Sequence, residues 1–165
     1  MWNLRYWIWS SLLLIGAYGE SALLETLETA TRGEIYLLSH KPLDGDGERF
    51  LVAPMKEERE ILEGVPLTEE DFEFVRGAFL EELAKETESV GMYKHMPIHA
   101  IRFYDANGAV VYETSICWMC RNIYVPEEGT ARWREFYHRE LKKFFMRQLP
   151  IPPEVIMEFR AKMGM

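Results

Sequence analysis

The sequence predicts an α+β domain in which an antiparallel sheet packs against amphipathic helices. Some stretches alternate apolar and polar residues between short turn sequences, and others carry apolar residues at helical spacing. The 165 residues are enough for one domain with its own core. The chain is 48% hydrophobic and 28% charged, which excludes an intrinsically disordered protein.

The predicted order of elements is helix, two strands, helix, two strands and two helices, so the sheet consists of two hairpins. A short first helix is expected over Ser21–Thr31, with Gly33 as its stop. The first hairpin is expected to pair Glu34–His40 with Phe50–Ala53 across an acidic turn, Leu43–Glu48.

Two longer helices follow from apolar spacing. Thr68, just after a proline, is an expected N-cap, and Thr130–Leu149 reads as a second amphipathic helix that ends at Pro150. Pro153 is well placed to begin a short final helix. The stripe of the first of these helices is Phe72, Val75, Phe79 and Leu83, and that of the second is Trp133, Tyr137, Leu141, Phe144 and Phe145.

The second hairpin, Ile98–Val125, is expected to turn at Asp105–Gly108. A two-residue turn at Asn107 and Gly108 sets Arg102 opposite Glu113, which predicts a cross-strand ion pair. The same register sends His99 to an apolar face and Cys117 to the opposite, polar face. A three-residue loop would bring His99 and Cys117 to one face but would mix apolar and polar residues there, so the two-residue turn is favoured.

The N-terminus has the pattern of a secretory signal peptide in residues 1–19, which leaves residues 20–165 as the mature domain. Arg5 precedes an apolar run over residues 6–18, and Ala17 and Gly19 are the small residues at the expected cleavage site. The run is shorter than the roughly 20 residues needed to span a bilayer. Export to the periplasm or outside is therefore predicted, with an uncleaved membrane anchor formed by residues 6–18 as the alternative.

The charge is unevenly distributed. Residues 20–129 hold 10 basic and 23 acidic residues, a net charge of −13, whereas residues 130–165 have a net charge of +4. An acidic body argues against nucleic acid as a partner. Membrane contact is expected only through the N-terminal segment, if that segment is not cleaved, and the basic C-terminal helix is expected to dock on the acidic body.

Cys117 and Cys120 are the only cysteines and are separated by Trp118 and Met119. In an oxidising compartment such a pair is expected to form a disulfide. Cα atoms three residues apart in a strand lie about 10 Å from one another, whereas a disulfide needs about 7 Å or less, so the backbone must turn or bulge here. A bridge closing so small a loop adds only about 2 kcal/mol, which favours a local functional role over simple stapling.

Two other uses of the cysteines remain open. A zinc or copper site would need further ligands, for which the candidates are His95, His99, His138 and nearby methionines (Met92, Met96 and Met119). A thiol–disulfide oxidoreductase would place the first cysteine at a helix N-terminus, whereas Arg121–Val125 is expected to be a strand. No hydrolase, phosphate-loop or dinucleotide motif is present.

The segments His99–Phe103 and Ile116–Ile123 together resemble a hairpin in small uncharacterised bacterial proteins, many of them exported, over about thirty residues. Those proteins often read Pro-x-His-Gly-Ile-Arg and then Ile-Cys-Phe-x-Cys. The matching positions here are Pro97, His99, Ile101, Arg102, Cys117 and Cys120. The resemblance implies bacterial origin and export, and it implies no reaction. The sequence as a whole predicts an exported binding or structural module with a CxxC hairpin, rather than an enzyme.

Overall fold

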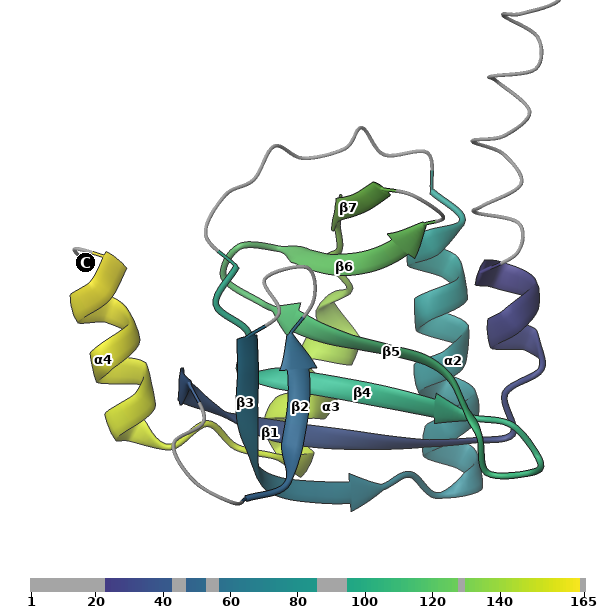
Figure 1. Ribbon diagram of the computed structural model, residues 1–165, viewed down its shortest axis with the longest axis horizontal. Helices are drawn as coiled ribbons and strands as arrows, with labels where there is room; N and C mark the ends of the chain where they lie inside the picture. Colours follow the sequence, from purple (N-terminus) through teal and green to yellow (C-terminus); the bar gives the residue numbers. More distant parts are fainter. Residues whose placement is uncertain (1–22, 43–46, 53–56, 86–94, 128–129, 164–165) are drawn as a thin grey trace, which may run out of the picture.

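The computed structural model describes residues 23–42, 47–52, 57–85, 95–127 and 130–163. Within them, seven strands form one antiparallel sheet in the order β2-β3-β1-β4-β5-β6-β7 (Figure 1). The strands are β1 (Arg32–Pro42), β2 (Arg49–Val52), β3 (Glu57–Pro66), β4 (His99–Tyr104), β5 (Val110–Cys117), β6 (Asn122–Glu127) and β7 (Thr130–Glu135). The labelled helices are α2 (Glu69–Leu83), α3 (Arg139–Gln148) and α4 (Pro153–Met163), and residues 23–28 are also helical. The α+β class is confirmed, but the sheet is a curled half-barrel and not two hairpins.

Strand β3 is one of the elements that the sequence pattern did not predict. It lies between β1 and β2, so the predicted direct pairing of Glu34–His40 with Phe50–Ala53 is wrong. Instead β1 pairs on one side with β3 and on the other with β4. Most side chains of β3 are exposed, and its charged residues hide the alternation that usually reveals a strand.

The predicted helix Thr130–Leu149 is also partly wrong, because its first six residues form β7. In that strand Trp133 pairs with Tyr124 of β6. The helix α3 begins at Arg139, and the Nδ1 atom of His138 accepts the backbone N–H of Leu141 at 3.1 Å as the N-cap. The aromatic residues of β7 and α3 together have the spacing expected of one helix, which explains the prediction of a single helix.

Helices α2 and α3 pack on one face of the sheet and form the main core with it (Figure 1). The predicted cap of α2 is confirmed, since the Thr68 hydroxyl accepts the N–H of Asp71 at 3.2 Å. Its predicted stripe is buried, and Phe79 of that stripe packs edge-on against Phe103 of β4 at 5.4 Å between ring centroids.

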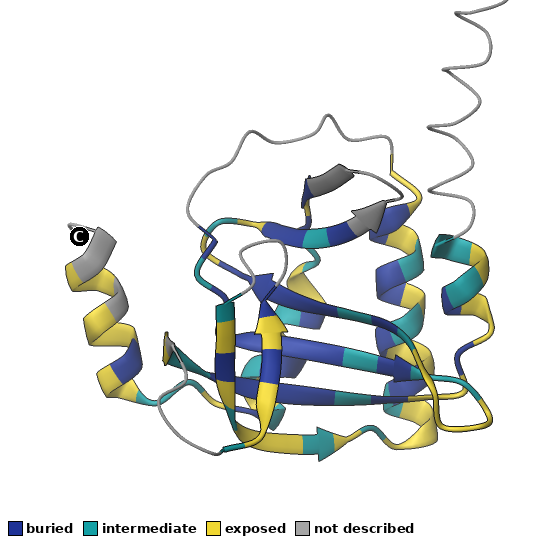
Figure 2. Cartoon of the chain, viewed as in Figure 1, coloured by how far each residue is buried: buried dark blue, intermediate teal, exposed yellow. Residues whose placement is uncertain are grey.

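The other face of the sheet has a smaller core because the sheet curls. Pairing of β1 with β3 shifts register between Leu37 and Leu38 and again before Pro42, and such bulges bend strands. The bend carries β2 and part of β3 across the face of β1 and β4. The small core there consists of Tyr36, Leu38, Phe50, Val52 and Ala100. Figure 2 shows the central strands mostly buried and much of β3 and α4 exposed.

The β4–β5 register is the predicted one, with Ile101 opposite Thr114 and Arg102 opposite Glu113. The predicted two-residue turn is wrong, because the loop holds three residues. The N–H of Asp105 donates to the carbonyl of Ala109 at 2.9 Å, and Gly108 takes a positive φ of 83°. A bulge just before the loop pairs Tyr104 with Val110, and this bulge keeps the strand register despite the longer loop.

Candidate functional site

The two cysteines lie at a four-residue turn between β5 and β6, which we call the cysteine turn (Trp118–Arg121). Cys117 pairs with Asn122 at the ends of the two strands. The backbone N–H of Cys120 donates to the Sγ atom of Cys117 at 3.2 Å, and Arg121 takes a left-handed φ of 52°. The predicted departure from extended backbone between the thiols is therefore confirmed.

The two thiols lie in different environments although they hydrogen-bond to each other. Cys117 is buried and Cys120 is half-buried, and neither forms a disulfide in the structure. The hydrogen bond from the Cys117 thiol lowers the pKa of Cys120 to about 7, with help from the backbone N–H of Met96. The same thiol pair and burial raise the pKa of Cys117. At neutral pH the negative charge of the pair is therefore placed on Cys120, the more accessible sulfur.

His99 supports the cysteine turn from the core side of the sheet. It is fully buried, as the predicted register required, and the indole N–H of Trp118 donates to its Nδ1 atom at 2.9 Å. Its Nε2 atom then carries the proton and donates to the carbonyl of Leu149 at 2.8 Å. Burial lowers the pKa of His99 from 6.5 to about 4, so the ring is neutral at physiological pH.

His95 supports the same turn from the opposite face. Its Nδ1 atom donates to the Asn122 side-chain oxygen at 2.8 Å, and its Nε2 atom accepts the Ser115 hydroxyl at 2.8 Å. Burial is also the main cause that lowers the pKa of His95 to about 4, and the positive charge of Arg59 adds to it. No sequence pattern pointed to Ser115 and Asn122, since isolated polar residues in strands are common.

These hydrogen bonds occupy the histidine nitrogens that a metal ion would need. Each ring uses both nitrogens, so neither His95 nor His99 has a free lone pair for a metal ion. His138 uses Nδ1 to cap α3, and its Nε2 atom lies 3.9 Å from Glu81. In the described part of the chain no group of three or more His, Cys, Asp or Glu side chains is arranged to hold a metal. The donors around the cysteine turn therefore do not fit a four-ligand zinc site.

The predicted ion pair between Arg102 and Glu113 is present, with Nε and Oε2 2.9 Å apart. The guanidinium of Arg102 also lies 5.1 Å from the ring centres of Tyr36 and Phe50. Arg102 thus covers the small second core and ties β4 to β5 and β2. This position gives the pair a structural role, away from the thiols.

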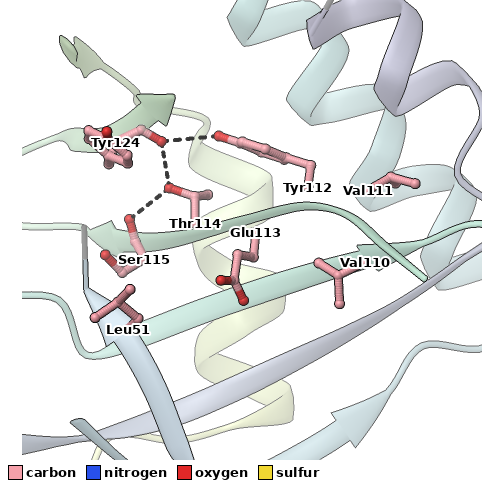
Figure 3. A pocket seen from close by; sticks show the side chains of 8 residues that line it. All are labelled: Leu51, Val110, Val111, Tyr112, Glu113, Thr114, Ser115 and Tyr124. Atoms are coloured by element: carbon pink, nitrogen blue, oxygen red, sulfur yellow. Dashed lines mark hydrogen bonds between the residues drawn. The ribbon is translucent and has the colours of Figure 1, made fainter. Parts of the chain in front are cut away.

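One hollow lies where β5 and β6 separate beyond their two paired positions. It has a volume of about 440 Å³, and Tyr112 and Thr114 donate across the gap to the carbonyl of Tyr124 at 3.2 and 2.8 Å (Figure 3). Leu51 of β2 lines its outer side. Its floor is thus closed by side-chain hydrogen bonds between the two strands.

A second hollow adjoins the cysteine turn, and we call it the methionine groove. It has a volume of about 320 Å³ and is bounded by the residues just before β4, the cysteine turn, α3 and α4. Seven of the lining side chains are apolar and two are cationic, and none is acidic. The lining residues are Met96, Ile98, Trp118, Met119, Met146, Ile151, Ile156, Lys142 and Arg160.

Comparison of the chain with known proteins gives no match to a protein-family model, to a curated protein or to a solved structure. The predicted signal peptide and the alternative anchor over residues 6–18 lie outside the described residues. Among the helices in the described ranges, none has the length and apolar character needed to cross a membrane.

Proposed function

We propose that this protein is an exported binding module whose CxxC turn forms a disulfide reversibly. The observation that carries the proposal is the contact between Cys117 and Cys120, which the turn creates before any bond forms. Because the turn already brings the sulfurs together, oxidation needs little rearrangement of the strands. Export is supported by the signal-like pattern of residues 1–19.

The chemistry follows from the unequal thiols. The Cys120 thiolate attacks one sulfur of a small-molecule disulfide such as oxidised glutathione, and a mixed disulfide forms as one glutathione thiolate leaves. Once Cys120 carries no charge, the buried Cys117 loses its proton more easily and attacks the Cys120 sulfur. The second glutathione leaves and takes up that proton. Counted from the dithiol, and so including the proton that Cys120 gave up to the first glutathione thiolate through the solvent, the protein loses two electrons and two protons.

The test is an intact mass spectrum of the full chain after incubation with oxidised glutathione. The expected product is about 2 Da lighter than the reduced protein, with no glutathione attached. Cys117→Ser is expected to stop at the mixed disulfide, whereas the matched Cys120→Ser variant is expected to react far more slowly. Equal, slow reaction of both variants would contradict the proposed roles of the two sulfurs.

A thiol–disulfide oxidoreductase is the second candidate, because a pKa of about 7 on a half-buried cysteine is typical of reactive thiols. It predicts catalytic reduction of insulin disulfides by the reduced protein, with loss of activity in Cys120→Ser. A binding module predicts the same single oxidation without turnover.

Zinc or copper binding, the other use of the cysteines that the sequence left open, is not supported by the histidine hydrogen bonds. It predicts one metal ion for each chain after purification without a chelator, and loss of that metal in Cys117→Ser. A native mass spectrum recorded without added reductant distinguishes metal binding from a disulfide.

A further inference from the structure

We propose that the methionine groove binds an amphipathic carboxylate with a straight apolar chain of medium length. This inference deepens the proposed binding role, on which it rests, but it does not depend on the thiol chemistry. The lining of the groove, its charges and its volume each narrow the class of ligand.

The apolar lining identifies the body of the ligand. Three of the nine lining side chains are methionines, Met96, Met119 and Met146. Thioether side chains are flexible and polarisable, so they adapt to a mobile alkyl chain better than rigid walls do. Met119 is 45% exposed and Ile156 is 39% exposed, so apolar surface at the mouth remains open to solvent.

The charges identify the head of the ligand. Lys142 of α3 and Arg160 of α4 face the groove from two elements, and no acidic residue lines it. Neither cation forms an ion pair or hydrogen bond with another described residue, whereas the neighbouring Lys143 is paired with Glu140 at 2.9 Å. Two unpaired cations beside apolar surface, in a chain with a net charge of −8, complement a single anionic group.

The volume limits the length of the chain. A volume of about 320 Å³ lies at the small end of the range of roughly 300–1,000 Å³ typical of small-molecule sites. A ligand with one extended chain of medium length suits this space, whereas a two-chain lipid exceeds it. Fatty carboxylates are the simplest compounds that combine such a chain with an anionic end.

The test is isothermal titration of the full chain with decanoate, below the concentration at which decanoate forms micelles. We expect saturable binding of one decanoate per chain. Decyltrimethylammonium, which has the same chain and the opposite charge, is expected to bind at least about tenfold more weakly. Equal binding of the two compounds would overturn the proposal, since it would show nonspecific detergent-like association, and so would the absence of saturable binding by decanoate.

Variants locate the site. The double variant Lys142→Gln/Arg160→Gln is expected to weaken decanoate binding by at least about tenfold, whereas Lys143→Gln is expected to leave it unchanged. On α4, Ile156→Ser is expected to weaken binding, whereas Met157→Ser, which is 70% exposed and outside the lining, is not. All five positions are at least partly exposed, so these variants are expected to fold. Equal effects of each variant and its control would place the bound decanoate elsewhere and overturn the proposal.

One further variant separates this inference from the proposed thiol chemistry. Cys117→Ser/Cys120→Ser cannot form the disulfide, yet its groove keeps every lining residue. We expect it to bind decanoate with nearly unchanged affinity. Decanoate binding by this variant would support the proposed site even if the wild-type thiols never form a disulfide. Loss of binding would overturn the claim that the groove binds its ligand independently of the thiols.

Discussion

The two turns that flank strand β5 reverse the chain by different means. The first, Asp105–Ala109, uses residues suited to turns. The Asp105 carboxylate accepts the backbone N–H of Asn107 at 2.9 Å and that of Ala109 at 2.8 Å, and Gly108 takes the positive φ. All of these interactions are local, so the turn needs little beyond its own sequence.

The cysteine turn contains neither glycine nor proline, and its left-handed residue is Arg121. Its local support is the hydrogen bonding between Cys120 and the Cys117 sulfur, including that of the Cys120 backbone N–H. The remaining supports come from distant segments: His99 holds Trp118, His95 holds Asn122, and the N–H of Phe136 donates to the Arg121 carbonyl at 2.8 Å. A conformation that the sequence does not favour, held by the surrounding fold, is more typical of functional sites than of plain connections.

The largest expected effect is that of pH, which is expected to act on the cysteine turn first. Folding lowers the pKa of His95 and His99 from 6.5 to about 4, so the unfolded chain binds more protons once the pH falls below 6.5. The contribution of the two neutral histidines to the free energy of unfolding is therefore fully present above pH 6.5. It is lost between pH 6.5 and 4, by on the order of 3 kcal/mol per histidine. Chemical denaturation at a series of pH values measures this loss.

The first turn gives the contrast within the same titration. The backbone N–H of Ala109 is the main cause that lowers the pKa of Asp105 below its usual 3.8, so this carboxylate keeps its charge to lower pH. The stability that the Asp105 carboxylate contributes is present above pH 3.8 and is lost only below that pH. Relative to the intrinsic exchange rate at each pH, amide hydrogen exchange at pH 5 is expected to be faster than at neutral pH in the cysteine turn and unchanged at Asn107–Ala109. Equal acceleration at both turns would contradict the comparison.

His99→Phe is expected to have the next largest effect. The ring keeps most of the buried volume, but the Trp118 N–H and the Leu149 carbonyl both lose their partner. Two buried groups left without hydrogen bonds cost about 4 kcal/mol together, measured as the free energy of unfolding. Ile101→Val, on the same strand and equally buried, is the control and is expected to cost about 1 kcal/mol. A similar small cost for both variants would show that His99 only fills space.

Gly108→Ala tests the locally encoded turn. Alanine at a φ of 83° costs about 1–2 kcal/mol, because an L side chain is strained there. The new Cβ would contact only the end of the Arg32 side chain at 3.4 Å, so the cost comes from the backbone. Gly77→Ala, on the exposed side of α2 with open space around it, is the control and is expected to stabilise the protein by about 1 kcal/mol. Thermal unfolding of both variants measures the difference. A stability change of the same sign in both variants would refute the role of the positive φ at Gly108.

The sequence predicted those features that depend on neighbouring residues. The register of β4 and β5 followed from matching apolar and polar faces, and the cap at Thr68 followed from a local motif. The turn between the thiols followed from strand geometry alone. The loop length at Gly108 was missed, because a bulge in β5 can absorb one residue without changing the register.

The features that were missed depend on tertiary contacts. Strand β3 pairs on both sides although half of its residues are charged, and β7 lies directly before a helix whose aromatic stripe its sequence continues. The hydrogen bonds of His95 join residues 20 and 27 positions away. The methionine groove draws its walls from four separate segments, so no local pattern reveals it.

The smallest expected effect belongs to Arg121, and its sign distinguishes the two turns. Arg121→Gly relieves a left-handed conformation that costs an L residue about 1–2 kcal/mol. Against this, glycine adds about 0.4–1 kcal/mol of backbone entropy to the unfolded chain. The variant also loses the stacking of the guanidinium on Tyr137, 4.6 Å from its ring centre, which contributes about 0.5–1 kcal/mol at an exposed site. The net change in unfolding free energy is therefore expected to lie within about 0.5 kcal/mol of zero.

Both variants lose the stacking, but only Arg121→Ala keeps the backbone strain, which exceeds the entropy that glycine adds to the unfolded chain, so it is expected to be less stable than Arg121→Gly by several tenths of a kcal/mol. Denaturant midpoints of the two variants, measured under reducing conditions, give this difference. At position 108 alanine replaces a residue already suited to the turn, whereas at position 121 glycine replaces one that the fold holds under strain. Both variants lack the arginine side chain, so a lower stability of Arg121→Gly would show that the backbone at position 121 is not strained. The cysteine turn would then be no more strained than the turn at Asp105.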